Sequence, residues 1–359
     1  MSEFEKYIDE YFEAKTNIEE EKVLIKALEI AEKNKNMENI IRCHLKLCMT
    51  EVFLGHDVES MNHLFWSFEN MTEEIINESD IYYDLMWNSK YITALVTLLF
   101  YDKDAIKEIF EWIKGLYEAN NEELKPIYGI LIHYHYYGLD LGYDMEDIFN
   151  KWKKEDNEFF DDCDACLKDS EINYYLKEKN YEKAFSLAED FDKEKISCEE
   201  VPALTYSNLL YPLVKESKFA KADKYYKEAY KLCKNDLNLI SGIIKIIEYL
   251  SIVDVEKAFE IYVENINLFD QIETEYGLLE LCFADYILFT GLSKKSAQVI
   301  IPFNKKTEYY NTNELASNFR NKYQEIVEKF DERNDNNYLS TYFKEKEDFY
   351  LNTFNVWRN

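Results

Sequence analysis

Glycine and proline are both scarce in this sequence. Its 359 residues include 8 glycines and 4 prolines, against usual shares of roughly 7% and 5%. Folds built from many short strands need such residues in turns about every 8–12 positions. The sequence does not supply them, so a fold based on sheets is not expected. The composition instead favours an all-α protein whose helices are joined by short polar turns.

Long apolar runs and a secretory leader are also missing. The longest apolar stretch, YITALVTLLFY, is shorter than the 18 or so residues that would suggest a membrane helix. The first residues, MSEFEKYIDEYF, are acidic and amphipathic, unlike a signal peptide. The 7 cysteines are scattered. We therefore expect a cytoplasmic protein with free thiols.

Positive charge is in short supply. The chain has 42 lysines and arginines against 71 acidic residues, a net charge of −29. Nucleic acids and anionic membranes attract basic surfaces, so neither is expected as a partner, whereas a basic protein or peptide would be attracted. The charge can also serve solubility alone, as in acidic, lysine- and asparagine-rich bacterial chains.

The negative charge is densest over residues 144–200. This segment holds 19 acidic residues and 9 lysines, about twice the charge density of the whole chain. Two interpretations stay open. It is either the solvated outer face of several helices or a docking patch for a basic partner.

Apolar residues are plentiful and follow a helical period almost everywhere. Hydrophobic residues make up 47% and aromatic residues 16% of the chain, which is enough for a large core. Short polar clusters separate amphipathic helices that occur in alternating pairs, so the chain is expected to be a helical repeat. The small or apolar residues that open the second helix of each pair are separated by 36 to 44 positions: Met61, Ala105, Ile148, Ala184, Ala222, Ala258 and Ala297.

The clearest repeat lies between residues 206 and 229. Tyr206 occupies a large aromatic position on the first helix, and Ala222, Tyr226 and Ala229 follow on the second at steps of four and three. The alanines would let the two helices approach closely, with Tyr226 filling the gap between turns. Pro212 lies within the first helix and should kink it or delay its start.

This pattern resembles the tetratricopeptide repeat family, whose period is 34 residues. The resemblance is specific over residues 170–300, whereas over residues 1–169 it extends only to the alternation of paired helices. The chain departs from the family in its longer periods and in the missing closing proline. It implies a right-handed α-α superhelix of about seven helix pairs. The expected organisation is capping helices at 1–35, repeats at 36–302 and a helical C-terminal cap at 303–359, with a loop at 331–337.

The resemblance also implies where a partner would bind. In such repeats the first helices of the pairs, the A helices, line a concave face that holds a protein or peptide. Counting back from the aligned second helices, or B helices, gives nine expected partner-binding residues: Lys46, Thr50, Lys90, His133, Tyr137, Asp169, Asn173, Ser207 and Tyr211.

No catalytic, cofactor or metal site is expected from the sequence. Cys163 and Cys166 have the spacing of half a zinc or redox site, but two further ligands at comparable spacing are not visible. A glycine-rich phosphate loop and a nucleophile elbow are also missing from the sequence. An enzyme with an unrecognised site is the least favoured alternative.

The expected function is therefore binding. The chain is predicted to be a non-enzymatic repeat protein that holds a basic protein or peptide, with an oligomeric state that the sequence does not define. One specific role is that of an immunity or inhibitor protein that neutralises a basic toxin. The alternative is an intracellular peptide-sensing regulator like the repeat-type pheromone receptors.

Overall fold

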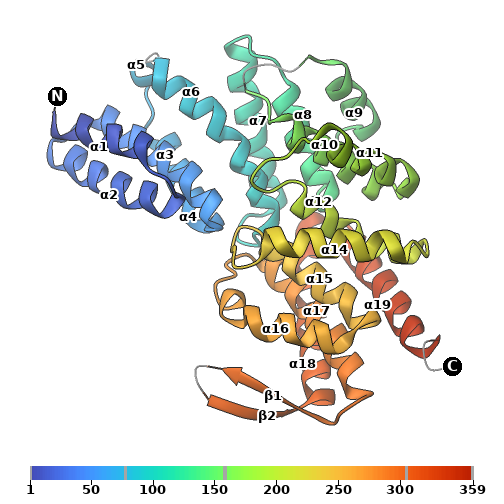
Figure 1. The fold of residues 1–359 in the computed structure, drawn as a ribbon. Helices are drawn as coiled ribbons and strands as arrows, with labels where there is room; N and C mark the ends of the chain where they lie inside the picture. The colour runs from blue at the N-terminus through green and yellow to red at the C-terminus, as the bar shows by residue number, and fades with distance from the viewer. Residues whose placement is uncertain (1, 77–78, 157–159, 304–305, 357–359) are drawn as a thin grey trace. The chain divides into compact units, whose positions relative to one another are not determined.

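The computed structural model describes residues 2–76, 79–156, 160–303 and 306–356, and these residues are mostly helical (Figure 1). The expected all-α class is confirmed. Of the helices in these ranges, none has both the length and the apolar content needed to span a bilayer. The elements are α1 Glu3–Glu13, α2 Asn17–Lys33, α3 Met37–Leu54, α4 Asp57–Asn70, α5 Glu73–Ile76, α6 Ser79–Asn88, the 3₁₀ helix η1 Ser89–Thr97, α7 Lys103–Ala119, α8 Lys125–Tyr136, α9 Met145–Lys154, α10 Asp164–Lys177, α11 Tyr181–Glu194, α12 Ala203–Asn208, α13 Leu210–Lys215, α14 Phe219–Cys233, α15 Ile240–Val253, α16 Val255–Phe269, α17 Glu275–Ser293, β1 Gln298–Phe303, β2 Lys306–Asn311, α18 Thr312–Asn334 and α19 Tyr338–Val356.

The chain divides into two compact units. The first contains Met1–Leu95, Lys107–Ile130 and Phe149–Asp161, and the second contains Val96–Ile106, Leu131–Ile148 and Asp162–Asn359. In the first unit, α1 packs against α2, α2 against α3 and α3 against α4. Buried Phe4, Ala27, Ala31 and Cys43 form a core between them. The first two helices lie in the segment expected to begin the array.

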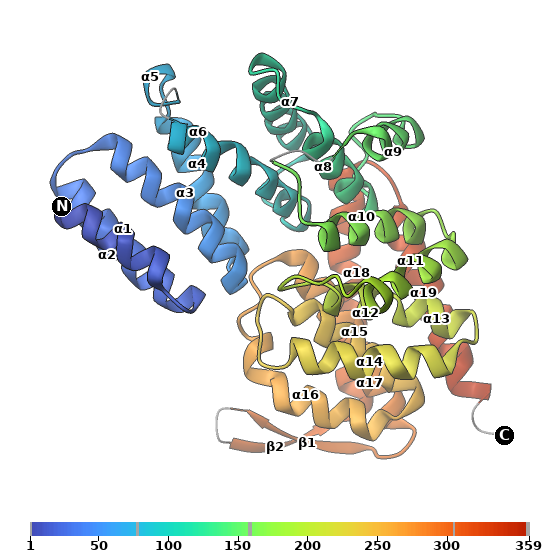
Figure 2. The ribbon, with the colours of Figure 1, turned by 45° about the horizontal axis from the view of Figure 1, so that its top comes forward.

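The second unit contains four successive helix pairs. Helix α10 packs on α11, α12 on α14, α15 on α16, and α17 on α18. We call α10, α12 with α13, α15 and α17 the A helices of this unit, and their partners the B helices. Each A helix also contacts the next A helix along the chain. Ala184, Ala222 and Ala258, the aligned residues of three B helices, are fully buried. In Figure 2, α14 and α16 follow one another on the same side of the unit.

Proline interrupts one A helix, as predicted. Pro212 has no N–H to donate to the carbonyl four residues earlier. The helix accordingly divides into α12 and α13, which meet at Leu209. The next helical hydrogen bond is present, because the amide of Leu213 donates to the carbonyl of Leu209 at 2.9 Å. The interruption is thus confined to a single residue.

The aromatic packing of the clearest repeat differs from the prediction by one position. Ala222 and Ala229 are fully buried as expected. The ring that stacks on Tyr206 belongs to Tyr225, with centroids 4.2 Å apart. Tyr226 lies instead beside Tyr249 of the next A helix, at 5.5 Å. Tyr226 therefore contributes to packing between repeats, and the prediction that it fills the gap within the pair was wrong.

Residues other than glycine form most of the tight turns that end helices. Lys35, Lys179, Ser217 and Asp335 all have φ between 53° and 57°. After each of them, the next amide donates to the carbonyl five residues before it, for example Lys218 to Leu213 at 2.7 Å. This is the Schellman arrangement, in which glycine is usual. A chain with few glycines can therefore still make short turns.

The region after α17 contains a feature that the sequence analysis excluded. Strands β1 (Gln298–Phe303) and β2 (Lys306–Asn311) pair in an antiparallel two-stranded sheet in which Val299 lies opposite Tyr310. Ala297, which was aligned as the start of a B helix, lies immediately before strand β1. The B helix of this pair is α18 instead. The tail after the strands is helical, as α18 and α19. The loop expected at 331–337 is shorter than predicted and spans only residues 335–337, because α18 continues to Asn334.

Helix α19 packs against the A helices. Its first residue, Tyr338, lies over Gly138, where an added Cβ would be 2.2 Å from the ring. The ammonium group of Lys177 on α10 lies 3.0 Å from the centre of the Tyr338 ring. Farther along, the ring of Tyr350 lies 5.8 Å from that of Tyr211 on α13. Contacts with α15 and α17 complete the interface.

Candidate functional site

A set of polar side chains recurs along the A helices of the second unit. We call this set the A-helix polar row; most of its members are half-buried, and Thr205 is fully buried. The members lie at spacings of 35 to 37 residues in two parallel series, one of Asp169, Thr205 and Ser241 and the other of Asn173, Asn208, Lys245 and Glu280.

Hydrogen bonds connect the first half of the row across α10 and α12. The hydroxyl of Thr205 donates to one carboxylate oxygen of Asp169. The amide of Asn173 donates to the other oxygen at 2.7 Å. The amide of Asn208 donates in turn to Oδ1 of Asn173 at 3.3 Å. Burial raises the pKa of Asp169 to about 6, while the two donors oppose that rise.

The second half of the row joins α15 to α17. Lys245 donates to Ser241 at 2.6 Å and forms an ion pair with Glu280 at 3.0 Å. Ser241 also donates to Glu280, at 2.6 Å. The side chains on α15 and α17 therefore hold one another in place. Binding a ligand here would cost less conformational entropy than ordering free side chains would.

One acceptor in the row lacks a donor. The buried Oδ1 atom of Asn208 accepts no hydrogen bond from the residues that the structure describes. A buried carbonyl-type oxygen in this state carries a desolvation cost of about 1–3 kcal/mol. A ligand N–H group placed here would remove that cost. Because this oxygen is itself buried, a ligand amide would reach it only after the side chains around it had moved.

Helix α19 shows what the A helices can accept. Lys346 of α19 forms a buried ion pair with Glu248 of α15 at 2.8 Å. The same ammonium group lies 5.3 Å from the ring centre of Tyr211 and 5.0 Å from that of Phe283. Tyr350 of α19 also donates its hydroxyl to Glu248. This part of the A helices thus holds a basic side chain between a carboxylate and aromatic rings.

Three of the nine predicted partner-binding residues lie in the first unit. Lys46 pairs with Asp84 at 3.0 Å. Thr50 is fully buried and donates to Glu20 at 3.3 Å. Lys90 is 8% exposed, and its ammonium group lies 3.8 Å from the centre of the Trp87 ring. Burial leaves Thr50 and Lys90 little surface to offer a partner.

The other six lie in the second unit. Ser207 is buried and donates to the carbonyls of Ala203 and Leu204. Tyr211 is 7% exposed because α19 covers it. His133 and Tyr137 are half-buried, with rings 4.8 Å apart. Only Asp169 and Asn173 belong to the polar row. Their role in binding stays a prediction.

The remaining members of the row were missed from the sequence. Thr205, Asn208, Ser241, Lys245 and Glu280 each follow another member by one repeat length. The recurrence of polar residues inside otherwise apolar helices was the available signal. It could not be used because the rotation of each helix about its axis was unknown.

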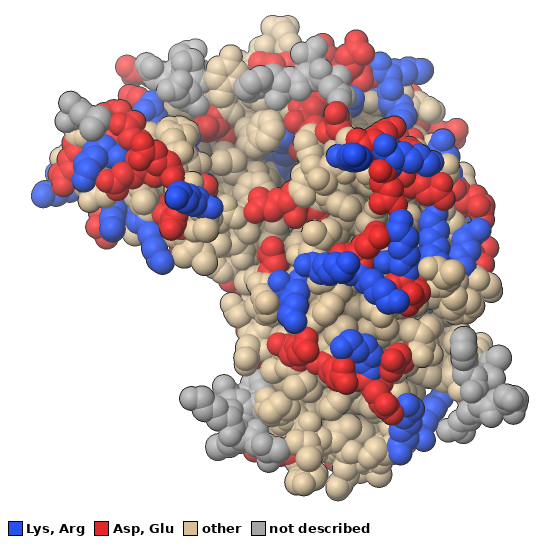
Figure 3. Space-filling view, in the orientation of Figure 1, with Lys and Arg blue, Asp and Glu red and all other residues tan. Residues whose placement is uncertain are grey.

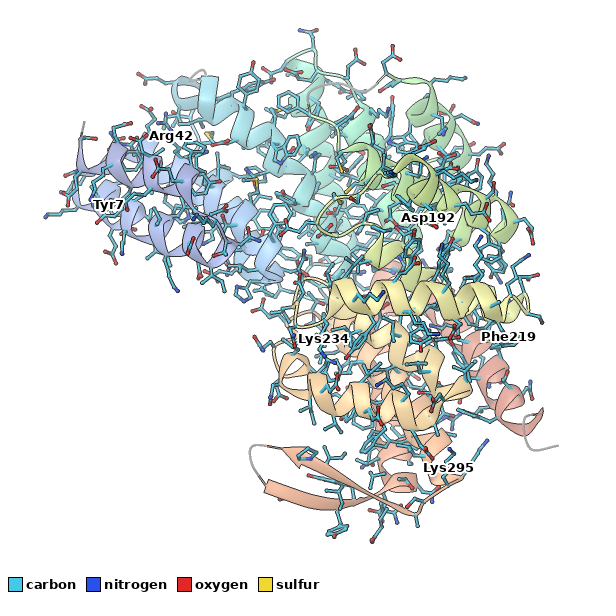
Figure 4. All side chains as sticks on the ribbon, in the orientation of Figure 1. Tyr7, Arg42, Asp192, Phe219, Lys234 and Lys295 are labelled. Carbon is cyan, nitrogen blue, oxygen red and sulfur yellow. The ribbon has the colours of Figure 1, made fainter. Side chains whose placement is uncertain are left out.

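Acidic residues of α11 are largely paired with lysines of the adjacent helices. Asp190 pairs with Lys168 of α10 at 3.2 Å, and Glu189 pairs with Lys221 of α14 at 2.8 Å. Asp192 of α11 pairs with Lys224, which is also on α14. Figure 4 labels Asp192, together with Phe219 and Lys234 at the two ends of α14. Figure 3 shows acidic and basic side chains interspersed over α14 and α16. Some of the acidic residues in 144–200 therefore form ion pairs that connect neighbouring helices.

A cluster of three thiols lies close to one end of the row. Cys163 directly precedes α10, Cys166 is in its first turn, and Cys198 is in the loop before α12. Their sulfur atoms all lie within 4.8 Å of one another. A hydrogen bond from Cys166 and backbone N–H groups of Val201 and Glu200 lower the pKa of Cys198 to about 5, and the same contact raises the pKa of Cys166. Sequence reasoning identified Cys163 and Cys166 but missed Cys198, which lies more than 30 residues away along the chain.

The chain matches no model of a known protein family, and no curated protein matches it.

Proposed function

We propose that this chain is a non-enzymatic helical-repeat protein of the tetratricopeptide-like kind that binds a basic protein or peptide. In this proposal the helix pairs continue into a right-handed superhelix, and the A helices line its inner face. The packing of four consecutive pairs in the second unit supports this arrangement, since each A helix there contacts both its B helix and the next A helix.

The observation that carries the proposal is the A-helix polar row with the unpaired Oδ1 of Asn208. Hydrogen-bonding side chains recur at one or two positions on each A helix, which matches an extended chain whose amides repeat along its length. Asp169 supplies negative charge in the first half of the row, whereas the charge of Glu280 is balanced by its ion pair with Lys245. Such a surface suits a peptide segment that carries both free amide groups and lysine or arginine side chains.

Two biological roles fit this binding function. The first is an immunity or inhibitor protein whose acidic surface captures a basic toxin. The second is a peptide-sensing regulator similar to the repeat-type pheromone receptors. Helix α19 favours the second role in one respect, because it occupies part of the A helices and an incoming peptide could displace it.

A selection experiment tests the proposal. A displayed library of short random peptides is selected on the folded protein, and the enriched peptides are measured by fluorescence anisotropy. We expect the enriched peptides to be net positive and to bind more weakly as salt rises. Asn208→Ala should weaken them by about 5- to 100-fold, because a buried N–H group left without an acceptor costs about 1–3 kcal/mol.

The control is Asn267→Ala, which removes the same side chain from an exposed position on the B helix α16. It should leave peptide affinity unchanged. Neutral or acidic selected peptides would contradict the expected partner charge. Undiminished binding by a folded Asn208→Ala protein would remove the polar row from the proposal.

A further inference from the structure

The loop between α11 and α12 brings a third cysteine to the Cys163–Cys166 pair. Cys166 Sγ and Cys198 Sγ are 3.5 Å apart, and all three sulfur atoms lie within 4.8 Å of one another. In a tetrahedral zinc site with Zn–S bonds of about 2.3 Å, neighbouring sulfur atoms are about 3.8 Å apart. The 3.5 Å separation of the Cys166 and Cys198 sulfur atoms is just below that value, and the other sulfur–sulfur separations are at most 4.8 Å. A zinc ion could therefore be enclosed with small side-chain movements.

We propose that Cys163, Cys166 and Cys198 form a three-thiolate site that binds one zinc ion. Zinc would replace the thiol protons, which pass to solvent, and the resulting zinc–trithiolate group would carry one net negative charge. This inference is independent of the peptide-binding function proposed above.

The backbone around the cluster is arranged to support thiolates. The amide of Val201 donates to Cys198 Sγ at 3.4 Å, and the amide of Glu200 also donates to it. Such N–H···S bonds orient metal-binding sulfur atoms and stabilise their charge. Cys163 occupies the N-cap of α10 without capping an amide through its side chain. The positive end of the helix dipole also favours a negatively charged group at this position.

Accessibility agrees with metal entry. Cys163 is exposed, whereas Cys166 and Cys198 are half-buried. Among the residues that the structure describes, the candidate ligand group consists of these three cysteines. Three protein ligands leave the fourth tetrahedral position to a water molecule. The other four cysteines, Cys43, Cys48, Cys233 and Cys282, are buried.

Metal titration tests the site in the full-length protein. The reduced, chelator-treated protein is titrated with Zn²⁺ against a chromophoric chelator, and separately with Co²⁺. We expect one Zn²⁺ per chain and, for Co²⁺, the strong near-ultraviolet absorption of thiolate-to-cobalt charge transfer. Removing a hydrogen bond that supports a metal ligand typically costs up to roughly 100-fold in metal affinity. Cys198→Ser removes a ligand itself, so it should weaken Zn²⁺ binding by more than that. Cys282→Ala should not alter it.

A second measurement needs no variant. The protein is alkylated with and without Zn²⁺, and modified cysteines are mapped by mass spectrometry. Zinc should protect Cys163, Cys166 and Cys198 together. Unequal protection, no uptake of metal, or a Cys198→Ser protein that binds as the parent does would each overturn the proposal. Isolation of a Cys166–Cys198 disulfide in place of a metal complex would assign the cluster to redox chemistry and overturn it as well.

Discussion

Asp285 is an ionisable residue buried in the second unit. It is 2% exposed on α17, and its Oδ1 atom accepts no hydrogen bond from the described residues. Burial raises the pKa of this carboxyl group well above its usual value, although Lys322 partly opposes the rise. In the folded protein the neutral acid is therefore favoured, whereas in the unfolded chain the carboxylate forms above about pH 4.

This difference predicts a pH-dependent loss of stability. Between the unfolded and folded pKa values of Asp285, the folded protein binds one more proton than the unfolded chain, so stability falls as pH rises, by up to about 1.4 kcal/mol per pH unit. Asp285→Asn cannot ionise. We expect it to match the parent near pH 4 and to become increasingly more stable than the parent as the pH rises towards 7, as measured by urea unfolding. The exposed Asp270→Asn should show no such divergence, and equal pH profiles for Asp285→Asn and the parent would refute the argument.

Tyr225 and Tyr226 show how far residue-scale prediction can go. The sequence identified Ala222 and Ala229 as buried, because small residues at helical spacing have one clear use. It did not distinguish two adjacent tyrosines, since one position along a helix is a rotation of about 100°. The same ambiguity explains why Ser207 was expected at the partner surface while its neighbour Asn208 was overlooked. Four of the nine expected contacts are buried for this reason or because α19 covers them.

At the scale of elements, the helix-ending turns offer a direct test. Ser217 has φ of 57° and is exposed. A non-glycine residue in this conformation costs roughly 1–2 kcal/mol, and glycine loses part of that gain through its larger entropy when unfolded. Ser217→Gly should therefore raise the free energy of unfolding by about 0.5–1 kcal/mol.

The matched control places the same substitution inside a helix. Ser186 is exposed on α11, and Ser186→Gly should lower stability by about 0.5–1 kcal/mol. Thermal or urea unfolding of the two variants separates the cases. If both variants lost stability, the left-handed conformation at Ser217 would not be limiting.

The helices of the second unit were easier to predict than its hairpin. The pairs from residue 184 to 269 carry regular small residues and a consistent period, and Pro212 marks its own helix break. The hairpin Gln298–Asn311 has no glycine and follows Ala297 at the repeat spacing. The sequence pattern therefore predicted a helix there. Strand pairing depends on contacts between residues distant in sequence, which periodicity does not report.

At the scale of the whole second unit, α19 is fixed by a buried charge pair. Lys346 and Glu248 are each 5% exposed and lie 2.8 Å apart. Removing one member of such a pair leaves a buried charge without its counterion and costs about 3–5 kcal/mol. We expect Lys346→Met to destabilise the unit by that amount in urea unfolding.

The double variant provides the contrast. Glu248→Gln combined with Lys346→Met removes both charges and should recover much of the loss. Lys344→Met, at an exposed position of the same helix, should change stability little. If Lys346→Met were as stable as the parent, α19 would be held by its aromatic contacts alone.

The position of α19 also has a consequence for biosynthesis. Its contacts reach Gly138, α10, α13, α15 and α17, yet it can dock only after residues up to about 356 have left the ribosome. Until then, α19 does not cover Tyr211, Glu248 and Phe283. These residues are synthesised roughly 60 to 140 residues before α19, which at 5–20 residues per second is a delay of seconds. Nascent chains are thus expected to expose an aromatic, acidic surface for that interval, and chaperones that bind apolar segments would have their main opportunity then.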